Sequence, residues 1–256
     1  MNRKLYKQSF TLNNPPDYNC PKCDIGILRI SKDTFKSYTT FDIEEAQDHP
    51  GFDPSWIEYI FNCIFQCNND KCNSKVACMG TGFVDWDMIF DEDGVPEQVW
   101  GDYFKPLFFS PNLKIINIPK PIPEEVLSLL NKSFELFFSS PSSSVNLVRA
   151  AIEEILTDQK VQRYVINKNK KRVKLTLHNR IEKLPEKYKD LKDSILAVKW
   201  LGNAGSHSKD SLNLDLDDAM DAYELTEEIL AKIYGSRNSD LANIVKGVNK
   251  SKGSRK

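Results

Sequence analysis

A proline-rich segment divides the chain into two parts with different hydrophobic patterns. Residues 118–123 place three prolines within five positions. Proline fixes φ and lacks a backbone N–H, so this stretch is excluded from helix interiors and central strands, and we expect a stiff connector over residues 119–123. Apolar residues before it mostly alternate, whereas those after it recur at helical spacing. The sequence therefore predicts an α+β chain, with a β-rich domain over residues 1–118 and a helical bundle over residues 124–236.

The two parts also differ in charge. The whole chain holds 35 Lys+Arg and 36 Asp+Glu, a net charge of -1. Residues 1–120 hold 12 basic and 17 acidic side chains, and residues 121–256 hold the remaining 23 and 19, so the net charges are -5 and +4. An anionic partner is therefore expected to meet the second part. Residues 237–256 are predicted to form a flexible basic tail, with a nucleic-acid-binding arm as the alternative.

Runs of alternating or β-branched residues predict strands in the first part. An acidic segment follows them, and its Ile89 stands where a calcium loop needs a carboxylate. A hairpin turn at Asp93 and Gly94 is therefore favoured over a metal loop. The predicted strands cover residues 26–30, 35–41, 60–65 and 75–84.

Four of the six cysteines form two pairs with the spacing of metal-binding turns. Cys20 and Cys23 are separated by two residues, and Cys67 and Cys72 by four. Two thiolates on one tight turn can reach the same tetrahedral ion, and the 43 residues between the pairs leave room for an inserted segment over residues 42–56. The spacing predicts a zinc ribbon with one structural zinc ion.

Two other uses of these cysteines compete with zinc. A redox pair would need a helix after the first two cysteines, and an iron–sulfur cluster would use the same thiolates. Cys63 and Cys78 are expected to pack in the core rather than to bind metal. A zinc ion held by four thiolates has no open coordination position, so it stabilises a fold and catalyses nothing.

The first residues lack the apolar run of a signal peptide, and no stretch of the chain is apolar enough to span a membrane. We therefore expect a cytoplasmic protein with no membrane partner, in a compartment where thiols stay reduced.

Five helices that form a bundle are predicted after the connector. Pro123 followed by Glu124 and Glu125 suits a helix start, because carboxylates are favoured at the positive end of the helix dipole. Gly235 is expected to end the last helix. The predicted helices cover residues 124–138, 145–156, 175–184, 186–201 and 215–234.

The end of the fourth predicted helix carries an unusual polar element. Two glycines, Asn203 and His207 follow Lys199 within nine residues. Asn203 and His207 are four residues apart and would share one helical face. They either hydrogen-bond a neighbouring backbone at a glycine-rich helix end, or form a polar site in which His207 acts as acid or base or binds phosphate.

This element belongs to a wider resemblance. Together with residues 145–153, 177–181 and 217–234, the run 197–207 resembles the prokaryotic domain of unknown function 4145. The resemblance extends from Cys20 to Gly235. It implies a helical domain similar to the HEPN superfamily, many of whose members are ribonucleases of toxin or defence systems, often dimeric. Related domains occur attached to restriction-enzyme subunits.

The superfamily's catalytic signature is an arginine followed, after four to six residues, by histidine. In this chain Trp200, Leu201 and Gly202 occupy the possible arginine positions, so the arginine is absent. Lys199 and Arg149 are the candidates to contact phosphate in its place. Arg149 could equally pair with Glu153, four residues later on the same helix.

Two functional hypotheses follow. The first is a zinc-binding interaction or nucleic-acid-binding protein, acting in anti-phage defence or on a mobile element. Its candidate phosphate contacts are Lys170, Lys171 and Arg172, within a basic stretch that could equally be an exposed loop between helices.

The second hypothesis is a metal-independent ribonuclease in which His207 is the acid or base and Asn203 orients the substrate. A nucleotide sensor using the same site is a third. The expected partners are RNA, DNA or a nucleotide, a second copy bound through the helical domain, and a protein encoded nearby.

Overall fold

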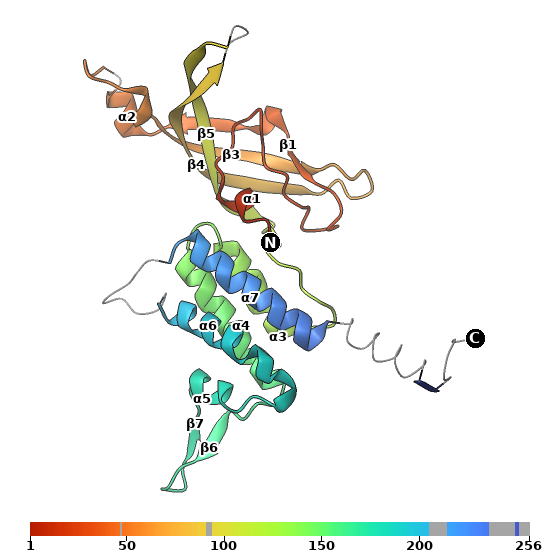
Figure 1. Cartoon of the computed structure of the whole chain (residues 1–256). Helices are drawn as coiled ribbons and strands as arrows, with labels where there is room; N and C mark the ends of the chain where they lie inside the picture. The colour runs from red at the N-terminus through yellow and green to blue at the C-terminus, as the bar shows by residue number, and fades with distance from the viewer. Residues whose placement is uncertain (47, 91–93, 205–213, 236–248, 251–256) are drawn as a thin grey trace. The chain divides into compact units, whose positions relative to one another are not determined.

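The chain folds into two units, the first mainly β and the second mainly helical. The computed structural model describes residues 1–256 except 47, 91–93, 205–213, 236–248 and 251–256. Asn2–Lys114 form one unit, and Ile115–Lys256 together with Met1 form the other. The first contains an antiparallel sheet and the second a group of helices (Figure 1). The predicted α+β class is confirmed.

The first unit is built on five antiparallel strands. β3 pairs with both β1 and β2 along one side and with β4 along the other, and β4 pairs with β5. Short elements occupy the connections, and two of them lie in the predicted insertion. The strands are β1 (Leu28–Ile30), β2 (Lys36–Thr39), β3 (Glu58–Cys67), β4 (Lys75–Phe90) and β5 (Pro96–Ser110); the short helices are α1 (Arg3–Lys7), η1 (Lys32–Thr34), α2 (Phe41–Ala46) and η2 (Pro54–Trp56).

The long β4–β5 hairpin reverses the chain at the predicted place, although Asp93 of the predicted turn lies outside the described residues. Phe90 lies opposite Pro96, and Gly94 between the strands has a φ of +77°, a conformation that glycine adopts without strain. Strand β5 itself was not predicted, because Gly101 and Pro106 interrupt its pattern. Pro106 is tolerated since β5 is an edge strand whose register shifts at this point.

The core of this unit lies on one face of the sheet. Alternate residues of β3 and β4 are buried, and the residues between them are mostly exposed. Phe61 and Phe104 pack there with Phe10 and Phe35 at ring-centroid distances of 4.8–5.9 Å. This face is what a period of two produces when one side of a sheet is covered.

The two remaining cysteines lie in that core, as expected. Cys63 on β3 and Cys78 on β4 are opposite each other in register, and both are buried. A hydrogen bond with Cys63 and burial raise the pKa of Cys78 far above that of a free thiol. Neither cysteine joins the other four.

The second unit is a bundle around α4. Helix α4 contacts α3, α6 and α7, and α6 also contacts α7. The fourth predicted helix is divided, because its first residues form a 3-10 turn before α6 begins. The helices are α3 (Glu124–Leu136), α4 (Pro141–Asp158), α5 (Leu177–Ile181), η3 (Glu186–Leu191), α6 (Lys192–Ala204) and α7 (Leu216–Tyr234).

A buried polar network joins three of these helices. The Tyr223 hydroxyl lies 2.7 Å from both Ser133 Oγ and Ser144 Oγ, and burial raises the tyrosine's pKa. Ser133 donates to the Leu130 carbonyl and Ser144 to the Ser133 carbonyl. Each hydroxyl therefore has a partner, which makes the network compatible with an apolar core.

The basic stretch differs from the predicted loop. It forms a two-stranded hairpin of β6 (Tyr164–Ile166) and β7 (Arg172–Lys174) between α4 and α5. Strands of three residues carry almost no alternation, and the lysines between them suit a loop equally well, so the pairing was invisible in the pattern. Among the described residues, no helix has the length and apolar character needed to cross a membrane.

Candidate metal centre

Two tight turns bring four thiols together at one end of the sheet. Cys20 and Cys23 lie on the turn before β1, whereas Cys67 ends β3 and Cys72 lies on the turn into β4. The Asp24 N–H donates to the Cys20 carbonyl at 3.0 Å, which closes the first turn. Pairing of β1 with β3 places Leu28 opposite Cys67, so the strand register sets one turn against the other.

The sulfur atoms are spaced as one tetrahedral ion requires. All four lie within 4.8 Å of one another, with Cys20 Sγ 3.8 Å from Cys72 Sγ and Cys23 Sγ 3.7 Å from Cys67 Sγ. Zinc–thiolate bonds of about 2.3 Å place the sulfurs of a tetrahedron about 3.8 Å apart. An iron–sulfur cluster needs room for several atoms between its thiolates. The four cysteines are therefore close enough to bind a single metal ion.

Glycine at position 26 is required by the approach of the two turns. A Cβ at Gly26 would lie 2.4 Å from Cys67 Sγ and 2.9 Å from the Asn69 side chain. The Gly26 N–H points at Cys23 Sγ at 3.4 Å, and the Asn69 N–H points at Cys67 Sγ at 3.4 Å. Backbone N–H groups directed at sulfur stabilise thiolates and orient the ligands.

The surroundings shift the pKa values of two of the thiols in opposite directions. The N–H groups of Gly26 and Ile25 lower the pKa of Cys23 to about 6. Burial raises the pKa of Cys67 to about 12. A metal ion must displace the proton from such a thiol, so binding is expected to release protons and to weaken in acid.

The donor set determines what a bound ion can do. Thiolate ligands favour zinc or another soft ion over magnesium or calcium. Four protein ligands fill a tetrahedral shell and leave no position for water or substrate. An ion here would hold the ends of β1, β3 and β4 together.

The helical candidates cluster around a close helix contact. A Cβ at Gly202 on α6 would lie 2.6 Å from Arg149 Cβ and 2.7 Å from Arg149 Cδ, so the α4 arginine lies across this glycine. Arg149 Nη2 also pairs with Glu153 Oε1 at 3.2 Å. The structure therefore contains the predicted pair of Arg149 with Glu153, and it brings the Arg149 side chain against Gly202.

Lys199 and Asn203 on α6 differ in exposure: Lys199 is buried, and Asn203 is half-buried. The Lys199 Nζ lies 3.3 Å from the centroid of the exposed Trp200 ring, a cation–π contact. Asn203 lies one residue before the end of α6. His207 falls outside the described residues, as does most of the predicted basic tail.

One buried cation was not anticipated. Arg180 on α5 is fully buried, and its guanidinium donates to the Glu153 carbonyl and to Thr157 Oγ1, both at 3.0 Å. Burial lowers its pKa. An arginine within a five-residue helix that also carries His178 and Asn179 gives no sign that another helix supplies its acceptors, so the sequence alone does not identify this link between α5 and α4.

Comparison with family models finds a separate match in each unit. Residues 8–109 match the domain of unknown function DUF8608, and residues 131–252 match the domain of unknown function DUF4145. The second match supports the resemblance for the helical part, but not its predicted extension to Cys20, because the cysteine-bearing unit matches a separate model. No curated protein and no solved structure matches the chain.

Proposed function

We propose that this is a zinc-stabilised nucleic-acid-binding protein, whose basic hairpin, residues 164–174, contacts phosphates. The observation that carries the proposal is local charge. Residues 163–174 contain six Lys+Arg and no Asp or Glu. A concentration of cations on one protruding element is the electrostatic footprint of phosphate binding.

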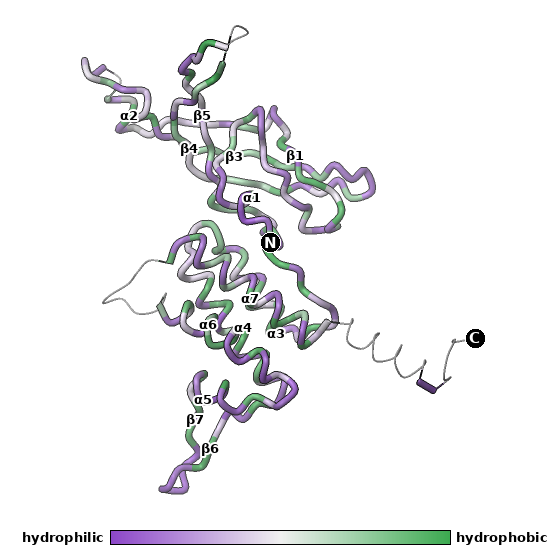
Figure 2. The backbone as a smooth tube through the Cα atoms, in the orientation of Figure 1, coloured by the Kyte–Doolittle hydropathy of each residue, from purple (hydrophilic) through white to green (hydrophobic). Residues whose placement is uncertain are grey.

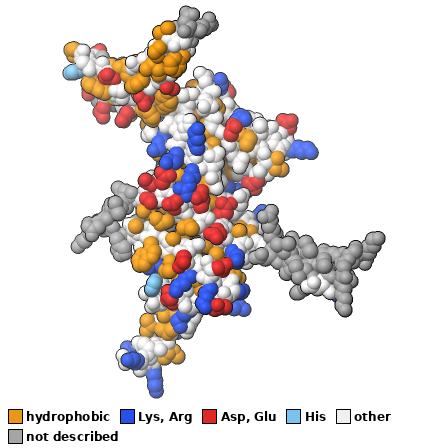
Figure 3. Space-filling model, viewed as in Figure 1, with side chains coloured by type: hydrophobic (Ala, Val, Ile, Leu, Met, Phe, Trp, Pro, Cys, Tyr) orange, Lys and Arg blue, Asp and Glu red, His pale blue; other side chains and the backbone are white. Residues whose placement is uncertain are grey.

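The cations of the hairpin are available to a ligand. Lys168, Lys170, Lys171, Arg172 and Lys174 are all exposed, and in the described part of the chain none of them forms an ion pair. Figure 2 colours the end of the hairpin as hydrophilic, and Figure 3 has Lys and Arg atoms at its far end. Nothing acidic within the hairpin competes with a phosphate for these side chains.

The turn that carries these lysines is well ordered by hydrogen bonds. The Asn167 side chain accepts from the N–H groups of Asn169 and Lys171, both at 2.9 Å. Lys170 has a φ of +56° and donates its N–H to the Asn167 carbonyl at 2.9 Å. A turn held in this way presents its cations with little further loss of conformational entropy.

An aromatic ring lies beside the cations. The Arg172 guanidinium is 3.9 Å from the centroid of the Tyr164 ring, and that of Arg163 is 5.9 Å away. Tyr164, Ile166 and Lys170 line a shallow depression with both arginines. Arginine stacked on a ring keeps its N–H fork free for phosphate, and the rest of the aromatic surface can stack on a base.

The metal has a structural part in this proposal. Zinc bound by Cys20, Cys23, Cys67 and Cys72 would form a ribbon-like turn pair that holds three strand ends. The sulfur spacing and the thiolate donors support zinc. A place in an anti-phage defence or mobile-element system remains a prediction from the resemblance, and so does a protein partner encoded nearby.

Fluorescence anisotropy of the full chain with labelled single-stranded RNA, single-stranded DNA and duplex DNA tests the binding. Lys171→Glu should weaken binding and reduce the slope of log K against log salt by about 0.7–0.9, the contribution of one phosphate. Lys132→Glu on α3 is the matched control, because Lys132 is an exposed lysine that forms no ion pair with any described residue.

The two variants carry the same change of charge, so only position distinguishes them. Equal effects would mean that net charge, not the hairpin, governs binding. No measurable binding of any of the three nucleic acids by wild-type protein would refute the proposal.

A second candidate function, metal-independent ribonuclease, is favoured by one observation. Arg149 lies against Gly202 and can supply from α4 the guanidinium that the signature lacks on α6. In this candidate Arg149 holds the scissile phosphate, His207 transfers protons, and Asn203 orients the substrate.

Incubation with labelled RNA in buffer without divalent ions tests it. Cleavage that is lost in His207→Ala and in Arg149→Lys, with the zinc content and melting curve unchanged, would favour the ribonuclease. Binding without cleavage would leave the nucleic-acid-binding function alone.

A further inference from the structure

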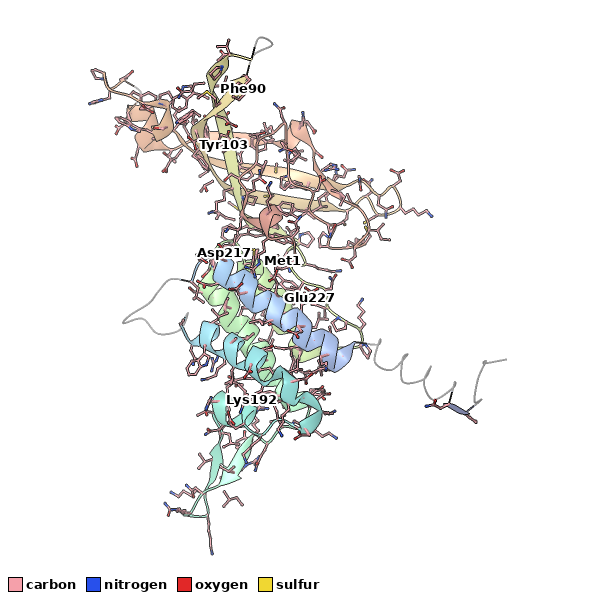
Figure 4. The ribbon with its side chains drawn as sticks, viewed as in Figure 1. Met1, Phe90, Tyr103, Lys192, Asp217 and Glu227 are labelled. Carbon is pink, nitrogen blue, oxygen red and sulfur yellow. The ribbon has the colours of Figure 1, made fainter. Side chains whose placement is uncertain are left out.

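The β4–β5 hairpin continues well beyond the sheet that supports it. Strand β3 follows β4 only as far as the pairing of Glu58 with Phe83. Beyond that point the hairpin is two strands alone, residues 85–90 and 96–101, which we call the β4–β5 extension. Figure 1 shows it protruding from the sheet, and Figure 4 places Phe90 near its end.

One face of the extension is apolar and exposed. Trp86, Met88 and Phe90 continue the row of β4 residues that, up to Val84, faces the core. Trp100 lies opposite Trp86 in register on the same face. Phe90 is 69% exposed and the two tryptophans about half exposed. The alternation that buries a sheet face is therefore maintained at the extension, where these side chains stay about half exposed or more.

The opposite face is acidic. Asp85 and Asp87 point to the other side of β4, and Glu97 lies opposite Ile89 on β5. Residues 85–102 contain seven Asp+Glu and no Lys or Arg. Such a segment repels nucleic acid and anionic lipid, so neither is a suitable occupant of the apolar face.

We propose that the apolar face of the β4–β5 extension packs against the same face of a second copy of the chain. In this arrangement the aromatic rows of Trp86 and Trp100 meet around a two-fold axis, as a self-complementary surface requires. The carboxylates of Asp85, Asp87 and Glu97 remain on the outer faces in water. The position of these three carboxylates away from the aromatic row thus fits a self-contact, which is independent of the proposed nucleic-acid function.

The available area fits a weak dimer. Aromatic side chains present roughly 150–250 Å² each, so the exposed parts of Trp86, Phe90 and Trp100 offer roughly 250–400 Å² per copy. Since about 60% of an interface is apolar, two copies would bury about 800–1,300 Å² in total. This range lies around the lower limit of specific interfaces, so we expect association in the micromolar range.

Two adjacent positions provide a matched pair of variants. Met88 is 46% exposed on the apolar face, and Ile89 is 45% exposed on the acidic face. Met88→Glu and Ile89→Glu therefore make the same change of charge at equally exposed neighbours, and differ only in the face that carries the new carboxylate. Sedimentation equilibrium of the full-length, zinc-loaded chain, from micromolar to several hundred micromolar, measures their dimerisation.

Wild type should dimerise, with Met88→Glu weakening the dimer at least about tenfold and Ile89→Glu changing it by no more than about threefold. Added salt should strengthen the dimer or leave it unchanged, because it screens repulsion between the acidic extensions. Trp100→Glu is a second variant on the apolar face, and zinc content and far-UV circular dichroism report whether each variant folds.

Three results would overturn the proposal. Wild type could stay monomeric over the whole range, as expected if a basic protein partner covers the face instead. The dimer could be insensitive to both glutamates, as expected for contact through the helical domain. Both glutamates could weaken it equally, which would make net charge and not the apolar face responsible.

Discussion

Replacement of Gly26 by alanine tests the close approach of the two cysteine turns. An added Cβ would lie 2.4 Å from Cys67 Sγ, whereas ordinary contact begins at 3.4 Å, so the atoms must separate by about 1.0 Å. Metal–ligand distances tolerate only about 0.2 Å. The turn that carries Cys23, or the end of β3, has to move before a tetrahedral ion can bind.

The cost can be bounded from the energetics of overpacking. Forcing an extra carbon into a well-packed site typically costs about 1–3 kcal/mol. Because about 1.4 kcal/mol is a factor of ten, Gly26→Ala should weaken zinc binding about 5- to 140-fold. Competition with a chromophoric chelator measures this ratio directly, and the melting temperature of the zinc-loaded chain should fall with it.

Gly51→Ala is the control for the general effect of replacing glycine. An added Cβ at Gly51 meets only the His49 ring, at 3.5 Å, which is an ordinary contact. Alanine there should leave zinc affinity unchanged and can stabilise the chain slightly through the unfolded state. If Gly26→Ala binds zinc as tightly as Gly51→Ala, the packing of the turns is not what the structure describes.

Three further predictions concern the ligands and the bundle. Elemental analysis should find one zinc per chain and none in Cys67→Ser, and retained metal in that variant would contradict a four-thiolate site. Gly202→Ala should lower the free energy of unfolding by about 1–3 kcal/mol in urea, because its Cβ would meet Arg149, although alanine normally stabilises a helix interior by about 1 kcal/mol; a stabilised variant would refute the close approach of the two helices. Tyr223→Phe should cost about 1 kcal/mol, since each serine keeps one bond, whereas the exposed Tyr164→Phe should change stability by less than about 0.5 kcal/mol in the same denaturation assay.

The features that sequence predicts well here depend on local spacing. The paired cysteines, the alternation of β3 and β4, and the helical stripe of α7 each lie within a short window. Asp215 caps α7 with a reciprocal Asp218 bond, and Gly235 follows its last residue, so both ends agree with the prediction. Local chemistry specifies these elements before any tertiary contact forms.

The features that were missed depend on distant partners. Strand β5 exists because β4 offers a long edge, and its own residues, interrupted by Gly101 and Pro106, do not alternate. The hairpin β6–β7 pairs only three residues on each side, among lysines that suit a loop equally well. Arg180 is buried because α4 presents the Glu153 carbonyl to it. Such acceptors and edges become visible only in three dimensions.

The metal centre and the β4–β5 extension occupy opposite ends of the same strand. Lys75, where β4 starts, lies opposite Gln66 beside the cysteine turns, and Met88 follows 13 residues later, about 40 Å along the strand. A bound ion therefore cannot touch the apolar face, and its influence on self-association has to pass through the folding of the sheet. After removal of zinc, the fraction of dimer should fall only as far as the β-strand signal in circular dichroism falls. A metal-free chain that keeps its sheet but loses the dimer would mean that the self-contact lies at the metal end and not at the extension.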